Sequence, residues 1–348
     1  MTMDDAPVDF RVLDTARNPT GVDAVRALLA QSQLAIDSDI HHFMQAWAGD
    51  HLVGCAGIAG NVIKCVAVAD SWRGKNLSAR LIQEMERFAL AQGHFHLFLF
   101  TRPCNIERFR QSGFWPIVQC DDTAVLMENT PIGIQRYCKS LQALRKPGPR
   151  VGAIVMNANP FTLGHRYLVE KAAAACDWLH LFVVREDASF FPFTERLAMV
   201  RAGVASFGNV TVHEGSEYLI SRATFPGYFL KDSGVVDQAW SCMDLLIFRH
   251  YIAPALGITH RFVGSEPFCA VTRYYNHAMH TWLEATDTDQ TPNIAVVEIP
   301  RTCRNAGEAI SASEVRRLLK AQHFARIRDI VPESTYSLLL HQYSAAVA

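Results

Sequence analysis

The hydrophobic and polar positions of the first 140 residues follow a mixed pattern, in which short apolar runs alternate with amphipathic stretches. Apolar runs bounded by Gly, Asn or charged residues predict strands, and apolar positions that recur every three or four residues predict helices. The predicted elements are a helix over 21–30, strands over 51–60 and 62–69, a helix over 77–92, a strand over 94–101 and a short helix over 106–111. This order predicts a mixed α/β domain with a small sheet that can pair antiparallel.

From residue 151 onward the pattern becomes a regular alternation of buried strands and helices. The predicted strands cover 151–156, 179–184, 210–213, 261–263 and 294–299, and the predicted helices cover 163–176, 195–205, 236–256, 270–283 and 312–321. Strands that alternate with helices at this spacing form a parallel, doubly wound sheet. Because such sheets bind ligands at the carboxyl ends of their strands, we expect the chemistry in the loops that follow the strands.

The stretch Lys139–Arg150 separates the two patterns. It combines several charges with a Pro-Gly-Pro sequence directly before a new apolar run, which is typical of a linker between domains. We therefore expect two domains, 1–145 and 146–348. The predicted fold class is α/β, with a mixed α/β domain followed by a Rossmann-like, doubly wound parallel-sheet domain. A chain of 348 residues, 49% of them hydrophobic, is long enough to bury two cores.

The charge balance argues against two classes of partner. The 33 Lys and Arg residues are matched by 34 Asp and Glu residues, so the sequence predicts no nucleic-acid-binding and no membrane-binding surface. No segment reaches the roughly 20 uninterrupted apolar residues of a bilayer span, and the start lacks the basic-then-apolar order of a secretory signal, which predicts a cytoplasmic protein. The nine cysteines form no C-x-x-C pair, and His41 and His42 are predicted surface residues, so no metal ligand is predicted.

The loop after the strand over 151–156 carries the first candidate site. Pro160 ends the strand, and Gly164 leaves room for a phosphate or an adenine ring close to the backbone. His165 lies in the first turn of the following helix, whose free N–H groups favour an anion. Thr162 and His165 are three residues apart and therefore fall on one side of that turn. Together they form the T-x-G-H variant of the H-x-G-H signature of nucleotidyltransferases.

The loop before the last predicted helix carries the second candidate site. Ser311, with Glu314 three residues later, forms a capping box that begins the helix at Ser311. Ile310, Ser313 and Arg316 complete the I-S-x-S-x-V-R motif that accompanies T-x-G-H in the nucleotidyltransferases. A hydroxyl, a guanidinium group and a helix dipole at one place predict a clamp for a phosphate chain.

With both motifs in hand, the second domain resembles the citrate lyase ligase family, ATP-dependent enzymes that acetylate the thiol prosthetic group of citrate lyase's acyl carrier subunit. The resemblance covers nearly all of residues 151–330. Beyond the two motifs, it extends over the segments Asn157–Leu168, Val183–Asp187, Phe191–Phe193, Thr224–Lys231 and Arg261–Pro267.

The first domain resembles the acyl-CoA N-acetyltransferase (GNAT) fold, through Ala69–Arg80 and the stretch from Asn105 to Phe114. The turn that holds the CoA pyrophosphate in that fold usually reads R-G-x-G-x-G or R-G-x-G-x-A. Here Asn76 and Ser78 stand at the second and third small positions. A retained fold without acetyltransferase chemistry is therefore as well supported as a working CoA site.

The resemblance to citrate lyase ligases implies a two-step reaction. Acetate attacks the α-phosphorus of ATP, with Mg²⁺ present, and the acetyl group then passes to the dephospho-CoA-derived thiol arm of citrate lyase's acyl carrier subunit. The residues matched to catalysis are His165, Thr162, Arg316 and Lys231. The residues matched to nucleotide binding are Asn157, Asn159, Pro160, Phe161, Gly164, Gly264, Ser265, Glu266, Ile310, Ser311 and Ser313. Arg185 and Arg196 are either further phosphate contacts or solvated side chains.

Three alternatives remain open at this point. The first is an adenylyltransferase that acts on a phosphate monoester, as in coenzyme A or pyridine nucleotide synthesis, because both motifs are shared with those enzymes. The second is an acetyl-CoA-dependent N-acetyltransferase that works from residues 1–140, against which Asn76 and Ser78 argue. The third is a partner protein that binds nucleotide without catalysis. Product analysis with ATP, acetate and a thiol carrier distinguishes them.

Overall fold

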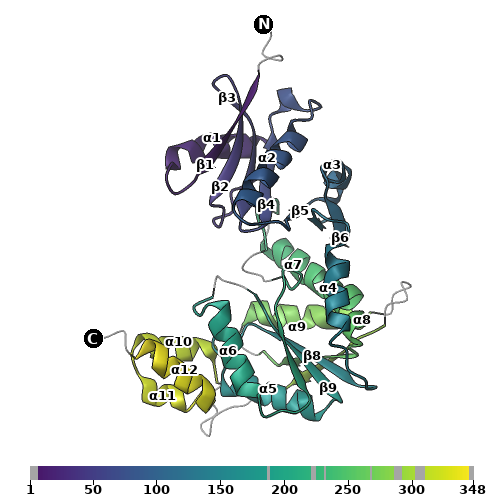
Figure 1. Cartoon of the computed structure of the whole chain (residues 1–348), viewed down its shortest axis with the longest axis vertical. Coiled ribbons are helices and arrows are strands. Elements are labelled where there is room, and N and C mark those ends of the chain that lie inside the picture. The colour runs from purple at the N-terminus through teal and green to yellow at the C-terminus, as the bar shows by residue number, and fades with distance from the viewer. Residues whose placement is uncertain are drawn as a thin grey trace. The chain divides into compact units, whose positions relative to one another are not determined.

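The computed structural model describes residues 7–185, 189–220, 225–230, 233–266, 269–285, 292–301 and 310–344. The chain forms two compact units (Figure 1). The first comprises Met1–Ile134 together with Pro226–Ala239, and the second comprises Gln135–Phe225 together with Trp240–Ala348. The first unit therefore includes a segment that lies far along the chain. The assignment of separate domains to 1–145 and 146–348 stays a prediction.

The first unit is built on a seven-stranded sheet with the order β1-β2-β3-β4-β5-β7-β6. Neighbouring strands are antiparallel, except that β4 and β5 are parallel and pair over two positions. Its elements are β1 (Val8–Asp14), α1 (Pro19–Gln31), β2 (His42–Ala48), β3 (His51–Ala59), β4 (Val62–Val68), η2 (Asp70–Trp72), α2 (Leu77–Ala91), β5 (Phe98–Thr101), η3 (Pro103–Asn105), α3 (Ile106–Gln111), β6 (Trp115–Cys120) and β7 (Ala124–Glu128).

Helix α2 packs on this sheet through one apolar face. Leu81 and Met85 are fully buried there among side chains of β2, β3 and β4. The spacing of these apolar positions is that of a helix with one face against a core, which is why the helix was predictable from the sequence. Gly54 in β3 lies so close beneath the helix that a Cβ would stand 2.7 Å from the Leu81 side chain.

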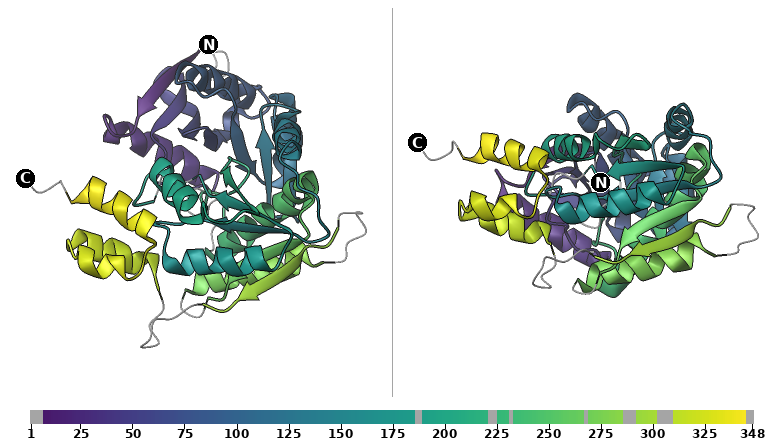
Figure 2. Two further views of the ribbon diagram at one scale, coloured as in Figure 1. Left: turned by 60° about the horizontal axis from the view of Figure 1, so that its bottom comes forward. Right: turned by 90° about the horizontal axis from the view of Figure 1, so that it is seen from below.

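The second unit contains a five-stranded sheet with the order β10-β9-β8-β11-β12, in which neighbouring strands are parallel. Helices lie on both faces of this sheet (Figure 2). Its elements, preceded by α4 (Gly133–Gln142), are β8 (Val151–Met156), α5 (Leu163–Ala174), β9 (Trp178–Val183), α6 (Phe193–Val204), β10 (Val210–Glu214), η4 (Phe248–Ile252), α8 (Ala253–Leu256), β11 (His260–Gly264), α9 (Ala270–Leu283), β12 (Ala295–Ile299), α10 (Ala312–Lys320), α11 (Phe324–Arg328) and α12 (Glu333–Tyr343). The helix α7 (Ser233–Ile247) belongs to the first unit as far as Ala239 and to the second from Trp240 onward.

The predicted α/β class, with a doubly wound parallel sheet after residue 150, is confirmed. The core on one face of the second sheet joins α5 and α6 to the C-terminal helices, and Val169, Val200 and Val315 are fully buried in it. Several elements were not predicted: the strands β1 and β2, the strands β6 and β7, the helices α11 and α12, and the helix α4, which includes the first residues of the predicted linker Lys139–Arg150. Among the described residues, no helix is both long enough and apolar enough to cross a bilayer.

His42 corrects one detail of the sequence analysis, because it is not a surface residue in a loop. It begins β2, is half-buried, and its ring lies 5.1 Å from the ring of Phe88. Strand β2 was missed because most of its side chains are buried, including Gln45 at 5% exposure, so its sequence has no alternation of polar and apolar positions.

A buried pair of histidines joins two neighbouring strands of the second sheet. His180 in β9 and His213 in β10 are 0% and 5% exposed, and His180 Nδ1 lies 2.8 Å from His213 Nε2. Burial lowers the pKa of His180 to about 4 and that of His213 to about 3. Both rings are therefore neutral in the folded protein at pH 7.

We expect this pair to make the protein sensitive to acid. Between about pH 6.5 and pH 4 the unfolded chain binds protons on these imidazoles and the folded chain does not, so the free energy of unfolding falls as the pH falls. For His180 alone the loss approaches about 3 kcal/mol. Urea unfolding at pH 7 and pH 5 measures the part of this loss that occurs above pH 5, about 2 kcal/mol. The double variant His180→Gln, His213→Gln should show a smaller difference between the two pH values, whereas the exposed control His341→Gln should keep the wild-type difference. An unchanged difference in the double variant contradicts the prediction.

Candidate active site

A cavity of about 480 Å³ lies at the carboxyl ends of β8, β11 and β12. The strand order changes direction at β8, because β9 and β10 lie on one side of it and β11 and β12 on the other. A doubly wound sheet opens a crevice at such a point. The lining residues are Thr162, Gly164, His165, Tyr167, Leu168, Val263, Gly264, Glu266, Thr272, Ile299, Pro300, Arg301, Ile310, Ser311, Ala312, Ser313 and Arg316.

The two predicted motifs meet in this cavity. Thr162, Gly164 and His165 come from the beginning of α5, and they share the cavity with Ile310, Ser311, Ser313 and Arg316 from the beginning of α10. About 150 residues separate the two turns in the sequence. The interpretation of the two motifs as a nucleotidyltransferase site requires that the two turns lie at one place, and they do.

The orientation of His165 follows from how α5 begins. Thr162 is the N-cap, and its hydroxyl oxygen accepts a hydrogen bond from the backbone N–H of His165. In return, His165 Nδ1 accepts a hydrogen bond from the backbone N–H of Thr162, at 3.0 Å. Because a backbone N–H can only donate, Nδ1 carries no proton, and the proton of the neutral ring is on Nε2. Within the described part of the chain, this leaves Nε2–H as a free donor.

Burial also keeps His165 uncharged. It lowers the pKa of the imidazole to about 4, and the positive charge of Arg301 acts in the same direction. The ring stacks on that of Phe161, with centroids 5.8 Å apart and an interplanar angle of 18°. Phe161 itself is 0% exposed and packs against Gly203, so it supports the histidine from beneath and does not line the cavity.

Ser311 begins α10, as predicted, but the cap is made with Ser313 and not as the predicted capping box with Glu314. The Ser311 side chain caps the helix by accepting a hydrogen bond from the backbone N–H of Ser313, at 3.2 Å, and the two hydroxyl oxygens are 2.5 Å apart. One turn later Arg316 donates a hydrogen bond to the carbonyl oxygen of Asn159. This contact joins the second motif to the loop that precedes the first, and it holds the guanidinium group at the cavity.

Arg301 is a site residue that the sequence analysis missed. It follows β12, lines the cavity, and forms an ion pair with Glu266. Its Nε also donates to the carbonyl oxygen of Ser265, at 3.0 Å. A signal was available, because Arg301 follows a predicted strand at its carboxyl end. Gly264 and Glu266 line the cavity as expected, whereas Ser265 contributes its backbone to this Arg301 contact.

The loop residues that precede the first motif are held by hydrogen bonds and by burial outside the cavity. Asn157 Oδ1 and the Asn157 carbonyl oxygen both accept hydrogen bonds from Arg196, at 2.6 and 2.8 Å. Asn159 Oδ1 accepts from the backbone N–H of Phe191, and Pro160 is buried. These three loop residues are absent from the cavity lining.

Arg196 corrects both sequence-based interpretations of that residue. It is 0% exposed, and its guanidinium group also donates to the carbonyl oxygens of Val184 and Phe191, so it is neither solvated nor in the cavity. Arg185 is exposed and lies 3.6 Å from Glu217 in an ion pair. Lys231, the remaining predicted catalytic residue, lies outside the described residues.

The two glycines that line the cavity, Gly164 and Gly264, have empty space at the position where a Cβ atom would lie. A Cβ added at Gly164 would meet nothing closer than 3.6 Å, and one at Gly264 would meet nothing within 4 Å. The fold itself therefore tolerates alanine at both positions. A requirement for glycine there would come from a ligand close to the backbone.

We expect Gly164→Ala to separate binding from stability. The variant should unfold at the wild-type temperature but lose nucleotide binding by roughly tenfold or more, the effect of about 1.4 kcal/mol. Gly203→Ala gives the opposite result, because its Cβ would stand 2.4 Å from the Phe161 ring and overpacking typically costs about 1 to 3 kcal/mol. Thermal unfolding and ATP titration measure both effects. Wild-type ATP binding by a folded Gly164→Ala variant contradicts the prediction.

Two family models match the chain in the order that the sequence analysis expected. Residues 151–339 match the citrate lyase ligase C-terminal domain, and residues 11–114 match the acetyltransferase (GNAT) family. The first match alone spans more than half of the chain. The chain belongs to the citrate lyase ligase family. Its first domain accordingly has the GNAT-like fold, and its second domain contains the site described above.

Individual relatives agree with this family. The citrate (pro-3S)-lyase ligase of Klebsiella pneumoniae is 51% identical over 318 residues, which cover 91% of this chain and 92% of the relative. The citrate (pro-3S)-lyase ligase of Escherichia coli strain K12 is 47% identical over 328 residues, 93% of each chain. A phosphopantetheine adenylyltransferase of Staphylococcus carnosus is 34% identical over 64 residues, 18% of this chain and 40% of that protein. As a member of this family, the chain is an enzyme of the ligase class.

Proposed function

We propose that this ligase uses ATP to acetylate the thiol prosthetic group of citrate lyase's acyl carrier subunit, through acetyl-adenylate, and thereby activates citrate lyase. The observation that carries the proposal is the meeting of the Thr162–His165 turn and the Ser313–Arg316 turn in one cavity, at the point where the strand order reverses. Relatives named citrate (pro-3S)-lyase ligase, similar over nine-tenths of the chain, supply the substrate class.

In the first step, an acetate oxygen attacks the α-phosphorus of ATP. The new bond joins acetate to the phosphorus, the bond to the bridging oxygen breaks, and pyrophosphate leaves with that electron pair. The enzyme supplies placement and positive potential, because charge grows on the phosphate oxygens and on the leaving group. Arg316 and Arg301 bring two guanidinium groups to the cavity.

His165 acts in this step as a neutral hydrogen-bond donor. Its Nε2–H donates to an oxygen of the reacting phosphate chain, and Thr162 holds the ring in the orientation that this requires. Ser311, Ser313 and the first turn of α10 offer hydroxyl and backbone donors to the same chain. None of these residues needs to become a nucleophile.

Mg²⁺ accompanies the triphosphate and neutralises part of its charge when it is bound. Glu266 is the one carboxylate among the described lining residues, and it is paired with Arg301. The donor set therefore fits an ion held chiefly by the phosphate oxygens of the substrate and by water. Lys231 is retained as a proposed cation near the phosphates on the sequence resemblance alone.

In the second step, the thiol of the carrier arm attacks the carbonyl carbon of acetyl-adenylate. A carbon–sulfur bond forms, the carbon–oxygen bond to the phosphate breaks, and AMP leaves while the thiol proton is released. The net products are the acetyl thioester, AMP and pyrophosphate. Activation as a mixed anhydride is needed because acetate by itself has no leaving group.

Product analysis tests the proposal. The protein is incubated with acetate, deacetylated citrate lyase complex and ATP labelled at the α-phosphorus. Labelled AMP together with restored lyase activity is the expected result. Labelled ADP contradicts an adenylate route. Labelled AMP without any gain of lyase activity contradicts the proposal that citrate lyase's acyl carrier subunit is the acceptor.

A second candidate function is adenylyl transfer to a phosphate monoester such as 4′-phosphopantetheine or a nicotinamide nucleotide. The short similarity to a phosphopantetheine adenylyltransferase, 34% identical over 64 residues, favours it. Pyrophosphate release on addition of 4′-phosphopantetheine, in the absence of acetate, would support this candidate. We expect pyrophosphate release with acetate and none with 4′-phosphopantetheine alone.

A further inference from the structure

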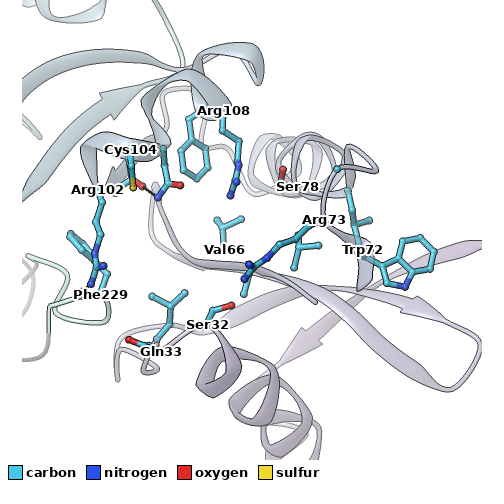
Figure 3. A pocket seen from close by; sticks show the side chains of 18 of the residues that line it. Ser32, Gln33, Val66, Trp72, Arg73, Ser78, Arg102, Cys104, Arg108 and Phe229 are labelled. Carbon is cyan, nitrogen blue, oxygen red and sulfur yellow. Dashed lines mark hydrogen bonds between the residues drawn. The ribbon is translucent and has the colours of Figure 1, made fainter. Parts of the chain in front are cut away.

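Two kinds of arginine lie near the cavities of this protein. In the first unit a cavity of about 620 Å³ is lined by Arg73, Arg102 and Arg108, and Figure 3 shows Arg73 and Arg108 extending into it. Arg196 in the second unit differs from them, because it is 0% exposed and is not among the described residues that line the cavity of about 480 Å³. Its nitrogen atoms donate to protein oxygens. An arginine of this second kind acts through the residues that it holds.

The hydrogen bonds of Arg196 join the loops that follow two neighbouring strands. Asn157 directly follows β8, and its carbonyl oxygen and Oδ1 accept from Arg196 Nη1 at 2.8 and 2.6 Å. Val184 directly follows β9, and its carbonyl oxygen accepts from the same nitrogen at 2.9 Å. Arg196 Nε donates to the carbonyl oxygen of Phe191 at 3.1 Å. One planar guanidinium group from α6 therefore fixes how the two loops lie relative to each other at the carboxyl edge of the sheet.

The loop after β8 has a backbone conformation that needs such support. Ala158 is 1% exposed and has a φ of 50°, in the left-handed region, where a residue with a Cβ is strained. Strain of this kind persists where the surrounding contacts hold the backbone firmly. The carbonyl group before Ala158, that of Asn157, is held by Arg196, and the carbonyl group of Asn159 after it accepts a hydrogen bond from Arg316. Guanidinium groups thus hold the strained residue from both sides.

Arg316 is the residue through which this loop reaches the cavity. Its side chain lines the cavity, and within the described ranges no carboxylate pairs with it and the Asn159 carbonyl oxygen is its hydrogen-bond partner. The place of the Arg316 guanidinium group therefore depends on where that carbonyl lies. The Asn159 side chain is fixed in turn, because its Oδ1 accepts from the backbone N–H of Phe191, at 3.1 Å. Arg196 holds the carbonyl group of the same Phe191.

We propose that Arg196 is a positioning residue for the adenylate-forming reaction, and that it sets the place of Arg316 through the loop Asn157–Asn159. The inference rests on the proposed function for the identity of the reaction. The role of Arg196 itself follows from the hydrogen bonds on both sides of Ala158. Arg196 touches no substrate atom, so its contribution exists only while Arg316 is present.

A double-mutant cycle between Arg196 and Arg316 tests the proposal. Arg196→Lys keeps the positive charge but loses the planar fork that joins Asn157 to Phe191. We expect it to lower the kcat of acetate-dependent pyrophosphate exchange by roughly tenfold in the wild-type protein and by less than about threefold in Arg316→Ala, because residues that act through one another are not additive. An equal fold-change in the two backgrounds would show a role in folding alone and overturns the proposal.

The matched control is Arg201→Lys. Arg201 belongs to the same helix α6, but its side chain is 51% exposed and pairs with Glu214 at the surface, at 3.0 Å. This variant should exchange pyrophosphate at the wild-type rate, and urea unfolding shows whether each variant is folded under the assay conditions. Wild-type exchange by a folded Arg196→Lys variant also contradicts the proposal.

A second variant serves if Arg196→Lys does not fold. Asn157→Ala removes the Oδ1 contact and leaves the carbonyl contact with Arg196 in place. In the same cycle it should lower kcat by about threefold in the wild-type protein and leave kcat unchanged in Arg316→Ala. Equal losses of kcat in the two backgrounds overturn the proposal here as well.

ATP binding separates a failure of this inference from a failure of the proposed function. Calorimetric titration with ATP and Mg²⁺ needs neither acetate nor an acceptor, and Arg196→Lys should weaken binding by about threefold or more only where Arg316 is present. Such a non-additive loss of ATP affinity, without any acetate-dependent exchange, would overturn the adenylate route and leave the role of Arg196 intact. Exchange by the wild-type protein with additive losses in both measurements would overturn the role of Arg196 alone.

Discussion

Alanine in place of His165 should lower acetate-dependent exchange of pyrophosphate into ATP by about 10²- to 10³-fold. This is the loss of roughly 2.7 to 4 kcal/mol that typically follows removal of one donor to a developing oxyanion. The effect should appear in kcat and much less in the KM for ATP, because the hydrogen bond strengthens as charge grows on the phosphate oxygens. Exchange of labelled pyrophosphate into ATP at several ATP concentrations measures both constants.

The pH dependence gives an independent check on the role of His165. Because burial lowers its pKa to about 4, the imidazole is neutral throughout the range from pH 6 to pH 9. We expect no change of kcat with a pKa near 6.5 in that range. An activity that rises or falls around pH 6.5 in the wild-type protein, and loses this dependence in His165→Ala, would show that the charge on His165 matters and would contradict the neutral-donor mechanism.

Alanine in place of Arg316 should reduce pyrophosphate exchange by about 10²-fold or more. The reason is that water cannot replace the charged hydrogen bonds that a guanidinium group makes to a phosphate inside a cavity. The same change removes the hydrogen bond to the carbonyl oxygen of Asn159, which should lower the free energy of unfolding by about 1 kcal/mol. Kinetics of exchange and urea unfolding measure the two losses separately.

Two variants sharpen the test of Arg316. Arg316→Lys keeps the charge but loses the planar fork of donors, so we expect it to recover part of the activity and not all of it. The neighbouring Arg317 is exposed and is not among the residues that line the cavity, which makes Arg317→Ala a matched control with wild-type exchange. Equal activity of Arg316→Ala and Arg317→Ala would remove Arg316 from the proposed mechanism.

The strands of the second unit are easier to predict from the sequence than those of the first, for a physical reason. In the parallel sheet each strand is a short apolar run followed by a helix, and the predicted 151–156 and 270–283 coincide with β8 and α9. In the first unit, β2 and β7 are buried on nearly every residue and lie between short connections, so neither a period of two nor a period of 3.6 residues marks them.

The candidate site was predictable where its geometry is local. Thr162 caps α5 and holds His165, and Ser311 caps α10, through hydrogen bonds that span at most three residues. Arg301 was not predictable in this way. Its place at the cavity depends on β12 lying beside β11, and its partner Glu266 is 35 residues away.

The sequence by itself determined the alternation of strands and helices between residues 151 and 321, the cap of α10 at Ser311 and the chemistry of the motif residues, because hydrophobic periodicity and capping act within a few residues of the chain. The tertiary structure decided which of those residues meet. Strand order and register brought His165 and Arg316 to one cavity, buried Arg196 behind it, and placed Tyr228 against β5 in the first unit. Such contacts depend on the packing of segments that lie far apart in the chain, and no local pattern encodes that packing.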